Sequence, residues 1–294
     1  MAPGRGDLSP DGIVRRLRAA GCVFAEDEAR LLVAEAPTPA RLAEMIDLRV
    51  AGLPLEQVLG WAEFFGMRIA VEPGVFVPRR RSELLVSEAA ALVRAGDDGV
   101  LPTGDDARSV VVVDLCCGSG AVGAALATEL TRDRRSDDRR GRSRDVELHA
   151  ADIDPVAVRC ARRNVAALGG LVHEGDLDGP LPDALRGHVD ILVANAPYVP
   201  TDEIRLMPPE ARDHEPPVAL DGGADGLDVQ RRVAAAAPRW LSPGGHLLIE
   251  TSRRQAPSTA AAVTSAGLVA QVVTSRDLDA TVVVGARPTS VEHT

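Results

Sequence analysis

The residues best suited to chemistry follow an apolar strand pattern in the second half of the chain. Ile-Leu-Val-Ala runs directly into Asn195, Ala196, Pro197 and Tyr198. A buried strand that ends in an amide and an aromatic ring is a poor structural solution, because it leaves both groups at the carboxyl edge of the sheet, where open α/β folds bind ligands. The Asn195 side-chain oxygen and the Ala196 carbonyl can accept the two N–H groups of a planar –NH2, and Tyr198 can stack on it. We therefore predict that these four residues form the catalytic corner for a planar nitrogen nucleophile.

Such a nitrogen is a poor nucleophile when its lone pair is delocalised into a carbonyl. Two acceptors that hold its N–H groups increase the electron density on nitrogen and aim the lone pair at an electrophile. Positioning and electrostatics then supply most of the catalysis, so the chemistry needs neither a metal ion nor a strong base.

A turn of small residues links an earlier apolar strand to a helix. The turn and the strand end contain Asp114, Cys116, Cys117, Gly118, Ser119 and Gly120. Gly118 and Gly120 would let a ligand approach backbone that a Cβ would block, and the N–H groups at the helix start attract an anion. With Gly123 the glycines also match a dinucleotide motif, but a pyrophosphate would be repelled by the acid. Asp114 can instead anchor the loop and meet an ammonium group, which favours S-adenosyl-L-methionine as the cofactor.

Two further acids follow the next strand patterns. Asp152 ends the second strand, where its carboxylate can accept both ribose hydroxyl hydrogens of the cofactor. Asp154, which precedes Pro155, is predicted to cap the following helix. Asp176 follows the third strand and suits the adenine amino group, with a plain turn aspartate as the alternative.

Alternating strand and helix patterns from residue 110 onward must position these residues. They predict a parallel sheet covered by helices. The strand candidates are 110–115, 147–152, 172–174, 191–195, 246–251, 268–273 and 281–284. No helix separates the last two strands, so the seventh is predicted to pair antiparallel. The arginine-rich stretch 132–145 is predicted to be a solvated loop, with a nucleic-acid patch as the alternative.

The first part of the chain has a different pattern. Helical spacing over residues 11–50 predicts three or four short helices, and we expect an N-terminal helical domain at 1–53. Alternation at 67–71, followed by Pro73-Gly74 and Val75-Phe76-Val77, predicts a hairpin within a linker at 54–81. The main α/β domain is then expected over 82–294.

Composition limits the classes of function. The chain has 294 residues, of which 45% are hydrophobic and 26% charged, which suits a globular protein of two domains. Its net charge of −10 argues against a broad basic surface, so we expect no direct nucleic-acid partner. No apolar run approaches a membrane span and no signal-type core follows the N-terminus. The four scattered cysteines form neither a disulfide framework nor a zinc pair. We therefore expect a cytoplasmic protein with no membrane partner and no metal site.

Beyond these single motifs, the chain resembles the protein-(glutamine N5) methyltransferases, the HemK-type enzymes that modify release factors. The resemblance runs from about residue 24 to 285. Besides Asn195–Tyr198 it rests on Pro54–Gly66, Val75–Glu83, Glu215–Leu227, and Ser242–Glu250 with Gln255.

This resemblance implies a fold, an activity and a set of site residues. The fold is that of the class I S-adenosylmethionine-dependent methyltransferases, α/β with a seven-stranded, mostly parallel sheet. Cys116–Gly120, Asp152 and Leu177 would line the cofactor site. Asn195–Tyr198 would hold a substrate glutamine, with Arg79 and Glu83 on the substrate side. The implied partner is a protein that presents a glutamine, either a peptide chain release factor or another protein.

The sequence departs from the family pattern at three places. Ala196 stands where the family's Asn-Pro-Pro-Tyr has its first proline, which keeps the carbonyl but no longer fixes φ. Cys116 replaces the first glycine of the cofactor loop. Arg80 and Arg81 replace a proline and an acid. These changes suggest a divergent paralogue with altered substrate choice.

Three other functions match parts of the sequence. A DNA adenine-N6 methyltransferase would hold its –NH2 in the same way, but it would need a basic groove and a target-recognition domain. A catalytically weak S-adenosylmethionine-binding protein that acts through protein contacts is motivated by Ala196 and the two loop cysteines. A nicotinamide oxidoreductase would use the glycine loop but leaves Asn195–Tyr198 unexplained. The interpretation that covers the most residues is N-methylation of a glutamine side chain.

Overall fold

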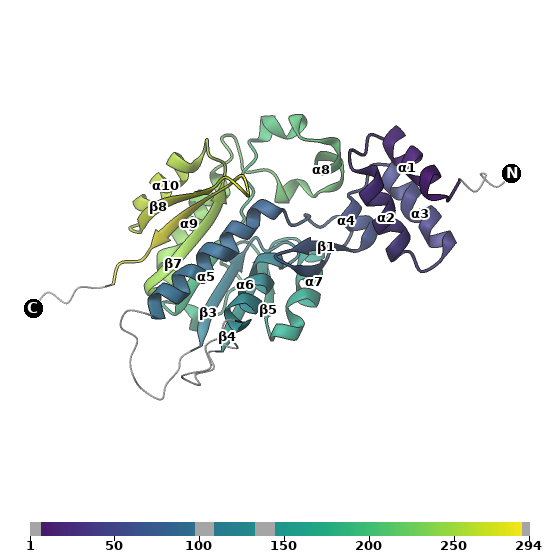
Figure 1. Ribbon diagram of the computed structural model, residues 1–294. Helices are drawn as coiled ribbons and strands as arrows, with labels where there is room; N and C mark the ends of the chain where they lie inside the picture. Colours follow the sequence, from purple (N-terminus) through teal and green to yellow (C-terminus); the bar gives the residue numbers. More distant parts are fainter. Residues whose placement is uncertain (1–6, 98–108, 133–144, 290–294) are drawn as a thin grey trace, which may run out of the picture.

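The computed structural model describes residues 7–97, 109–132 and 145–289 of the chain (Figure 1). Nearly all of the arginine-rich stretch that was predicted to be a solvated loop therefore lies outside the described residues. Within the described ranges, no helix is both long enough and apolar enough to cross a lipid bilayer.

A seven-stranded sheet forms the centre of the molecule, with the order β5-β4-β3-β6-β7-β9-β8. Neighbouring strands are parallel from β5 to β7, whereas β9 is antiparallel to both β7 and β8. This arrangement confirms the expected class I fold and its antiparallel last strand. The strands are β3 (Val110–Leu115), β4 (Val146–Asp152), β5 (Leu171–Glu174), β6 (Val189–Ala194), β7 (Leu241–Thr251), β8 (Val269–Ser275) and β9 (Ala280–Ala286).

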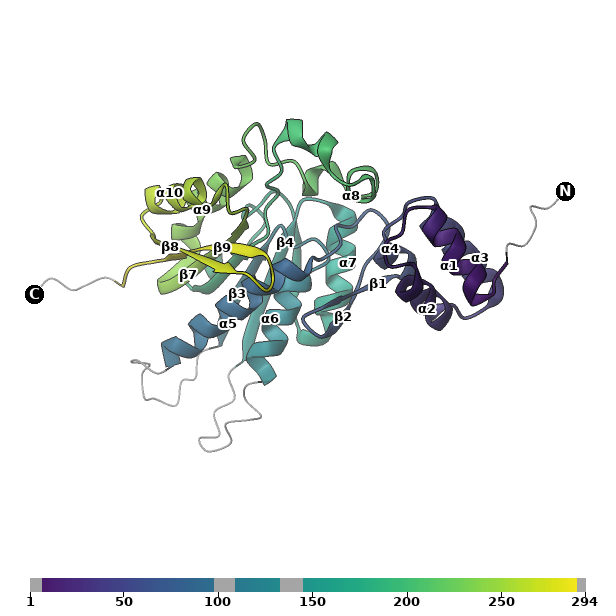
Figure 2. The same ribbon diagram turned by 45° about the horizontal axis from the view of Figure 1, so that its top comes forward.

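Helices cover both faces of this sheet, as Figures 1 and 2 show. On one face lie α5 (Glu83–Asp97), α6 (Ala121–Arg132) and α7 (Pro155–Val165), and on the other lie α9 (Asp228–Trp240) and α10 (Ala256–Ser265). Side chains along β3 alternate between two cores. Val110 and Val112 pack with α5 and α6, while Val111 and Val113 pack with α9 and α10. Because both of its faces are buried, β3 is a continuous run of valines from Val110 to Val113.

The N-terminal helices have a core of their own and lie at one end of the molecule (Figures 1 and 2). Ser9 and Thr38 cap the first and third helices by accepting backbone N–H groups. A buried ion pair between Arg49 Nε and Glu28 Oε2, 2.7 Å apart, links the third helix to the second. The domain boundaries expected at residues 53 and 81 stay predictions. The helices are α1 (Pro10–Ala19), α2 (Ala25–Glu35), α3 (Pro39–Val50) and α4 (Leu55–Leu59).

The linker contains a hairpin, but not the one that the sequence suggested. β1 (Trp61–Phe64) pairs antiparallel with β2 (Met67–Ala70), so the hairpin turn precedes the predicted turn at Pro73-Gly74. Phe65 and Gly66 connect them, both with positive φ, as tight hairpin turns prefer. The predicted pairing of residues 67–71 with 75–77 is therefore wrong. Val75 and Val77 instead form an irregular segment that is buried against Cys160 of α7 and leads towards the cavity described below.

A long connection between β6 and α9 contains a short helix, α8 (Pro209–His214). Glu210 of this helix lies 3.4 Å from Arg49 of α3, so the connection contacts the N-terminal helices. The same connection returns to β6, where Val199 and Asp221 form an isolated parallel bridge. Its residues thereby come to lie over the carboxyl ends of the central strands.

Candidate active site

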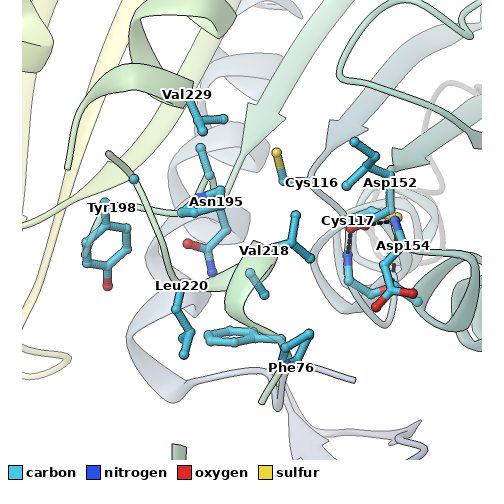
Figure 3. A pocket seen from close by; sticks show the side chains of 18 of the residues that line it. Phe76, Cys116, Cys117, Asp152, Asp154, Asn195, Tyr198, Val218, Leu220 and Val229 are labelled. Carbon is cyan, nitrogen blue, oxygen red and sulfur yellow. Dashed lines mark hydrogen bonds between the residues drawn. The ribbon is translucent and has the colours of Figure 1, made fainter. Parts of the chain in front are cut away.

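A cavity of about 570 Å³ lies at the carboxyl ends of β3, β4 and β6, a volume within the usual range for small-molecule sites. Figure 3 shows Asn195 and Tyr198 towards one end and Cys117, Asp152 and Asp154 towards the other. Following the sequence predictions, we name these the acceptor end and the cofactor end. Apolar side chains, among them Phe76, Val218, Leu220 and Val229, line the space around and between the two ends.

Asp152 organises the cofactor end. Its Oδ2 accepts the N–H of Gly118 at 2.8 Å, and its Oδ1 accepts the N–H of Asp154 at 2.9 Å. A carboxylate has about four acceptor positions, so two remain for ligand hydroxyls. A Cβ on Gly118 would point into open space, and its positive φ favours glycine. At Gly118 the loop therefore exposes its backbone to the cavity.

Asp114 anchors the glycine loop from below. Its Oδ2 accepts the N–H of Gly123 at 2.8 Å, which joins the end of β3 to the first turn of α6. The residue is only 1% exposed, and burial raises the pKa of its carboxyl to about 7. An ammonium group bound beside it would favour the ionised form and lower that pKa. The charge of the Asp114 carboxyl would therefore increase when an ammonium group binds beside it.

Other predicted residues of the cofactor end differ in their exposure to the cavity. Cys116, Cys117, Ser119 and Leu177 line it, whereas Gly120 does not. A Cβ on Gly120 would lie 3.1 Å from that of Ala161 on α7, so this glycine permits helix packing rather than ligand approach.

Asp176 also lines the cavity, but it is already paired. Its Oδ2 lies 2.7 Å from Arg232 Nη2 on α9. The pair joins the loop after β5 to the opposite face of the sheet. Its second oxygen remains the predicted acceptor for an adenine amino group.

At the acceptor end, a hydrogen bond to Ser82 orients Asn195. Its Nδ2 donates to Ser82 Oγ at 3.2 Å. The Ser82 side chain also faces the buried Glu250 carboxyl group, which burial disfavours in its ionised form. The amide of Asn195 therefore directs Nδ2 at Ser82, and its Oδ1 is left to accept an N–H in the cavity.

The same carboxylate holds the aromatic residue of the motif. Tyr198 OH donates to Glu250 Oε1 at 3.2 Å, and burial raises the pKa of both groups. Arg81 Nε lies 3.3 Å from the same oxygen, with its guanidinium 5.9 Å from the centre of the Tyr198 ring. Gln255 Nε2 donates to the Tyr198 carbonyl at 2.9 Å and fixes the loop backbone. Tyr198 therefore stays a neutral ring in a fixed position.

The two residues expected on the substrate side have different surroundings. Arg79 lines the cavity and lies 2.5 Å from Glu215 Oε1, whose side chain is fully buried. Glu83 is not part of the lining, since its Oε1 accepts the N–H of Phe65 and ties α5 to the β1–β2 turn. The structure thus brings together most, but not all, of the residues that were predicted from the sequence.

Several lining or supporting residues were not predicted. Ser82, Arg81 and Glu250 were noticed only as parts of the family resemblance, with no role assigned. Ile153 lines the cavity beside Asp152 and is 50% exposed, which suits contact with a flat ring. Its apolar side chain between two acids, Asp152 and Asp154, was the available signal.

The fold and the cavity together define the class of protein. Open backbone at Gly118, free acceptor positions on Asp152 and the buried carboxylate of Asp114 match the ribose hydroxyls and the ammonium of S-adenosylmethionine. The two acids at the loop do not match a pyrophosphate. The protein is a class I S-adenosylmethionine-dependent methyltransferase.

Comparison with known proteins identifies the family. No protein-family profile matches the chain. A release factor glutamine methyltransferase of Streptomyces coelicolor is 38% identical over 76% of this chain and 71% of its own length. One from Mycolicibacterium smegmatis is 35% identical over 86% of this chain and 82% of its own length. The chain therefore belongs to the release factor glutamine methyltransferase family.

Two further similarities were found. A 4-amino-L-phenylalanine/4-methylamino-L-phenylalanine methyltransferase of Streptomyces pristinaespiralis is 34% identical over 86% of this chain and 79% of its own length. Among solved structures, a methyltransferase from Pyrococcus furiosus has a TM-score of 0.49 at 14% identity, covering 76% of this chain and 90% of that one.

Proposed function

We propose that this chain transfers a methyl group from S-adenosylmethionine to the side-chain amide nitrogen of a glutamine in a protein. The observation that carries the proposal is the hydrogen bond from Asn195 Nδ2 to Ser82 Oγ at the acceptor end of the cavity. It leaves Asn195 Oδ1 as an acceptor at the end of a cavity whose other end suits the methyl donor.

Asn195, Ala196 and Tyr198 hold the acceptor amide and polarise it. When bound, S-adenosylmethionine supplies the methyl group as an electrophilic sulfonium. Asn195 Oδ1 and the Ala196 carbonyl accept the two N–H groups of the glutamine amide, which increases electron density on its nitrogen. Tyr198 provides a flat, neutral surface for the amide plane. The nitrogen becomes acidic once it is methylated, so water can take its proton and no strong base is needed.

The protein partner is a finer part of this proposal. The names of the relatives support a peptide chain release factor as the methylated protein, and the changes at Ala196, Arg80 and Arg81 support a divergent one. A cytoplasmic location and the lack of direct nucleic-acid binding stay predictions. The net charge of −10 supports the second of these and disfavours a DNA adenine methyltransferase.

A second candidate acceptor is an aromatic amine on a free amino acid. The relative that is named for 4-amino-L-phenylalanine favours it, because its similarity extends over 79% of that protein. An aromatic amine is also a planar nitrogen with a delocalised lone pair. The same corner of Asn195, Ala196 and Tyr198 would hold it.

Mass spectrometry after incubation with isotopically labelled S-adenosylmethionine tests both candidates. The acceptors are release factors, glutamine peptides and 4-amino-L-phenylalanine, with Asn195→Ala as the inactive control. We expect a labelled methyl on a glutamine side chain that depends on Asn195. Label on the aromatic amine alone would replace the proposed substrate, and label on adenine of added duplex DNA would support the DNA enzyme.

A further inference from the structure

Two arginines line the acceptor end of the cavity beside Asn195 and Tyr198. They are Arg79 and Arg81. Arg80, which lies between them in the sequence, is exposed and is not part of the lining. Asp221 also lines the cavity, but its Oδ1 accepts both the Thr201 hydroxyl and the Gly223 N–H. The charge of the two arginines is therefore the feature to explain.

Arg79 is engaged by the protein itself. Its Nη2 lies 2.5 Å from Glu215 Oε1, a fully buried side chain, and its guanidinium lies 5.1 Å from the centre of the Phe76 ring. Glu215 Oε1 also accepts the N–H of Val77 at 3.2 Å. Arg79 thus neutralises a buried acid and ties the segment before α5 to the connection after β6, which is a structural role.

Arg81 is held differently. It meets Glu250 through Nε, at 3.3 Å, and its side chain remains 47% exposed. An Nε contact leaves the two terminal amino groups with four N–H donors. In the part of the chain that the structure describes, no hydrogen bond of those terminal groups is recorded, although Arg81 lines the cavity. Glu250 therefore holds Arg81 through Nε, and the two terminal amino groups of the guanidinium remain available to a ligand.

The guanidinium of Arg81 lies close to the residues that are proposed to hold the reacting nitrogen. Ser82, the next residue, holds Asn195, and the Arg81 guanidinium lies 5.9 Å from the Tyr198 ring centre. A planar fork of N–H donors matches the two oxygens of a carboxylate better than any neutral group. A carboxylate on the acceptor would therefore meet Arg81 while the planar nitrogen meets Asn195.

We propose that Arg81 binds a carboxylate of the acceptor, so that the preferred substrate carries an acid in addition to its planar nitrogen. This inference rests on the proposed function and narrows its substrate class. The carboxylate can belong to an acidic side chain beside the glutamine of a protein, or to the α-carboxylate of a free amino acid. Both sources share the chemistry that Arg81 recognises, and the experiment below separates them.

Calorimetric titration of the enzyme saturated with S-adenosylhomocysteine measures this preference without requiring turnover. The probes are one glutamine peptide with Glu, Ala or Lys next to the glutamine, and 4-amino-L-phenylalanine with its carboxamide. We expect the Glu peptide, or the free carboxylate form of the amino acid, to bind about tenfold more tightly than its neutral counterpart, which is the size of one charge-assisted pair.

Variants then assign the preference to Arg81. Arg81→Gln should abolish it, Arg81→Lys should keep part of it, and the neighbouring Arg80→Gln should retain it fully. Because each result is a ratio between two ligands of the same variant, a partial loss of folded protein does not affect it. Equal affinities for acidic and neutral probes in the unchanged protein would overturn the inference, as would an unchanged ratio in Arg81→Gln.

The same probes separate this inference from the proposed function. A carboxylate preference that is seen only with 4-amino-L-phenylalanine, together with methylation of that amine alone, would keep Arg81 as the carboxylate site and remove the glutamine. Methylation of all three peptides with no preference among them would keep the glutamine and remove Arg81.

Discussion

The two ends of the cavity are built in different ways. At the cofactor end, Asp114 bonds a backbone N–H nine residues later, and Asp152 bonds the N–H of Gly118 and that of Asp154, two residues later. At the acceptor end, Asn195 is held by a side chain 113 residues away, and Tyr198 by one 52 residues away. One end is mostly backbone shaped by strand-to-turn geometry, and the other is a network of side chains from separate segments. Changes at the first end should therefore alter affinity, and changes at the second should alter turnover.

The largest effect expected from this contrast is at Asn195. Asn195→Ala removes an acceptor that holds the reacting nitrogen, so turnover should fall about a hundredfold or more. The affinity for S-adenosylmethionine and the melting temperature should change little, because no loop of the cofactor end bonds this side chain. Initial rates with saturating cofactor, and calorimetry of cofactor binding, check the two parts. A variant that loses cofactor affinity to the same extent as turnover would break the contrast between the ends.

At the cofactor end the matching test is the pH dependence of cofactor affinity. Burial raises the pKa of Asp114 to about 7, so its carboxylate is mostly ionised at pH 8 and mostly neutral at pH 6. The cofactor ammonium favours the ionised form, so affinity should fall as pH falls through about 7, by about tenfold between pH 8 and pH 6. Asp114→Asn keeps the acceptor for Gly123 and should make the affinity independent of pH in this window.

The pH dependence of the melting temperature of the ligand-free protein provides a control, because ionised Asp114 should destabilise the fold. The folded pKa of Asp114 lies above the ordinary value of 3.8, so the ionised group costs folding free energy that is fully present above about pH 7. Asp114→Asn should therefore raise the melting temperature more at pH 8 than at pH 5. An Asp114→Asn variant with the unchanged pH slope of cofactor affinity would show that the ammonium is bound elsewhere.

This contrast also explains which parts of the site the sequence could predict. Asp114, Gly118 and Asp152 each follow their own strand directly, so a strand pattern and a turn were enough to place them. The seven strands were predicted for the same reason, since their apolar runs are local. The hairpin was misplaced because Phe65 is an unusual residue for a turn position with positive φ, whereas both residues of Pro73-Gly74 are typical of turns.

The acceptor end could be predicted only in part. The segment from Asn195 to Tyr198 was predicted because polar groups at the end of a buried strand need hydrogen-bond partners. The neighbouring sequence did not indicate which residues those partners are. Ser82 lies in the short 3-10 helix just before α5 and Glu250 at the end of β7, and such contacts depend on the packing of the whole sheet. Glu83 was assigned to the substrate side by the family resemblance, yet its carboxylate accepts the N–H of Phe65 and does not line the cavity.

A smaller effect should follow from removing the support of Asn195 rather than Asn195 itself. Ser82→Ala deletes a neutral hydrogen bond and frees the amide to flip, so turnover should fall by roughly tenfold at most. Ser82→Thr retains the hydroxyl and should restore most of the rate, which a purely structural loss would not explain. The Michaelis constant for S-adenosylmethionine should stay unchanged in both variants. Equal rates for Ser82→Ala and the unchanged protein would remove Ser82 from the positioning of Asn195.

The smallest effect is expected at Ala196, where the chain departs from its family. Ala196 precedes Pro197, and a residue before proline is already restricted to extended backbone, a region that proline itself adopts. Within the described residues its φ is not positive and no hydrogen bond of its N–H is recorded, so a proline ring would break no contact of the backbone. Ala196→Pro should therefore leave turnover within about threefold and raise the unfolding free energy by about 0.4–1 kcal/mol through the stiffer unfolded chain. Denaturant unfolding and initial rates measure the two effects. Inactivation without unfolding would mean that the native φ at this position lies far from −65°. The acceptor end would then depend on a backbone conformation that the family's proline cannot adopt, and the substrate would have to be sought beyond the family's own.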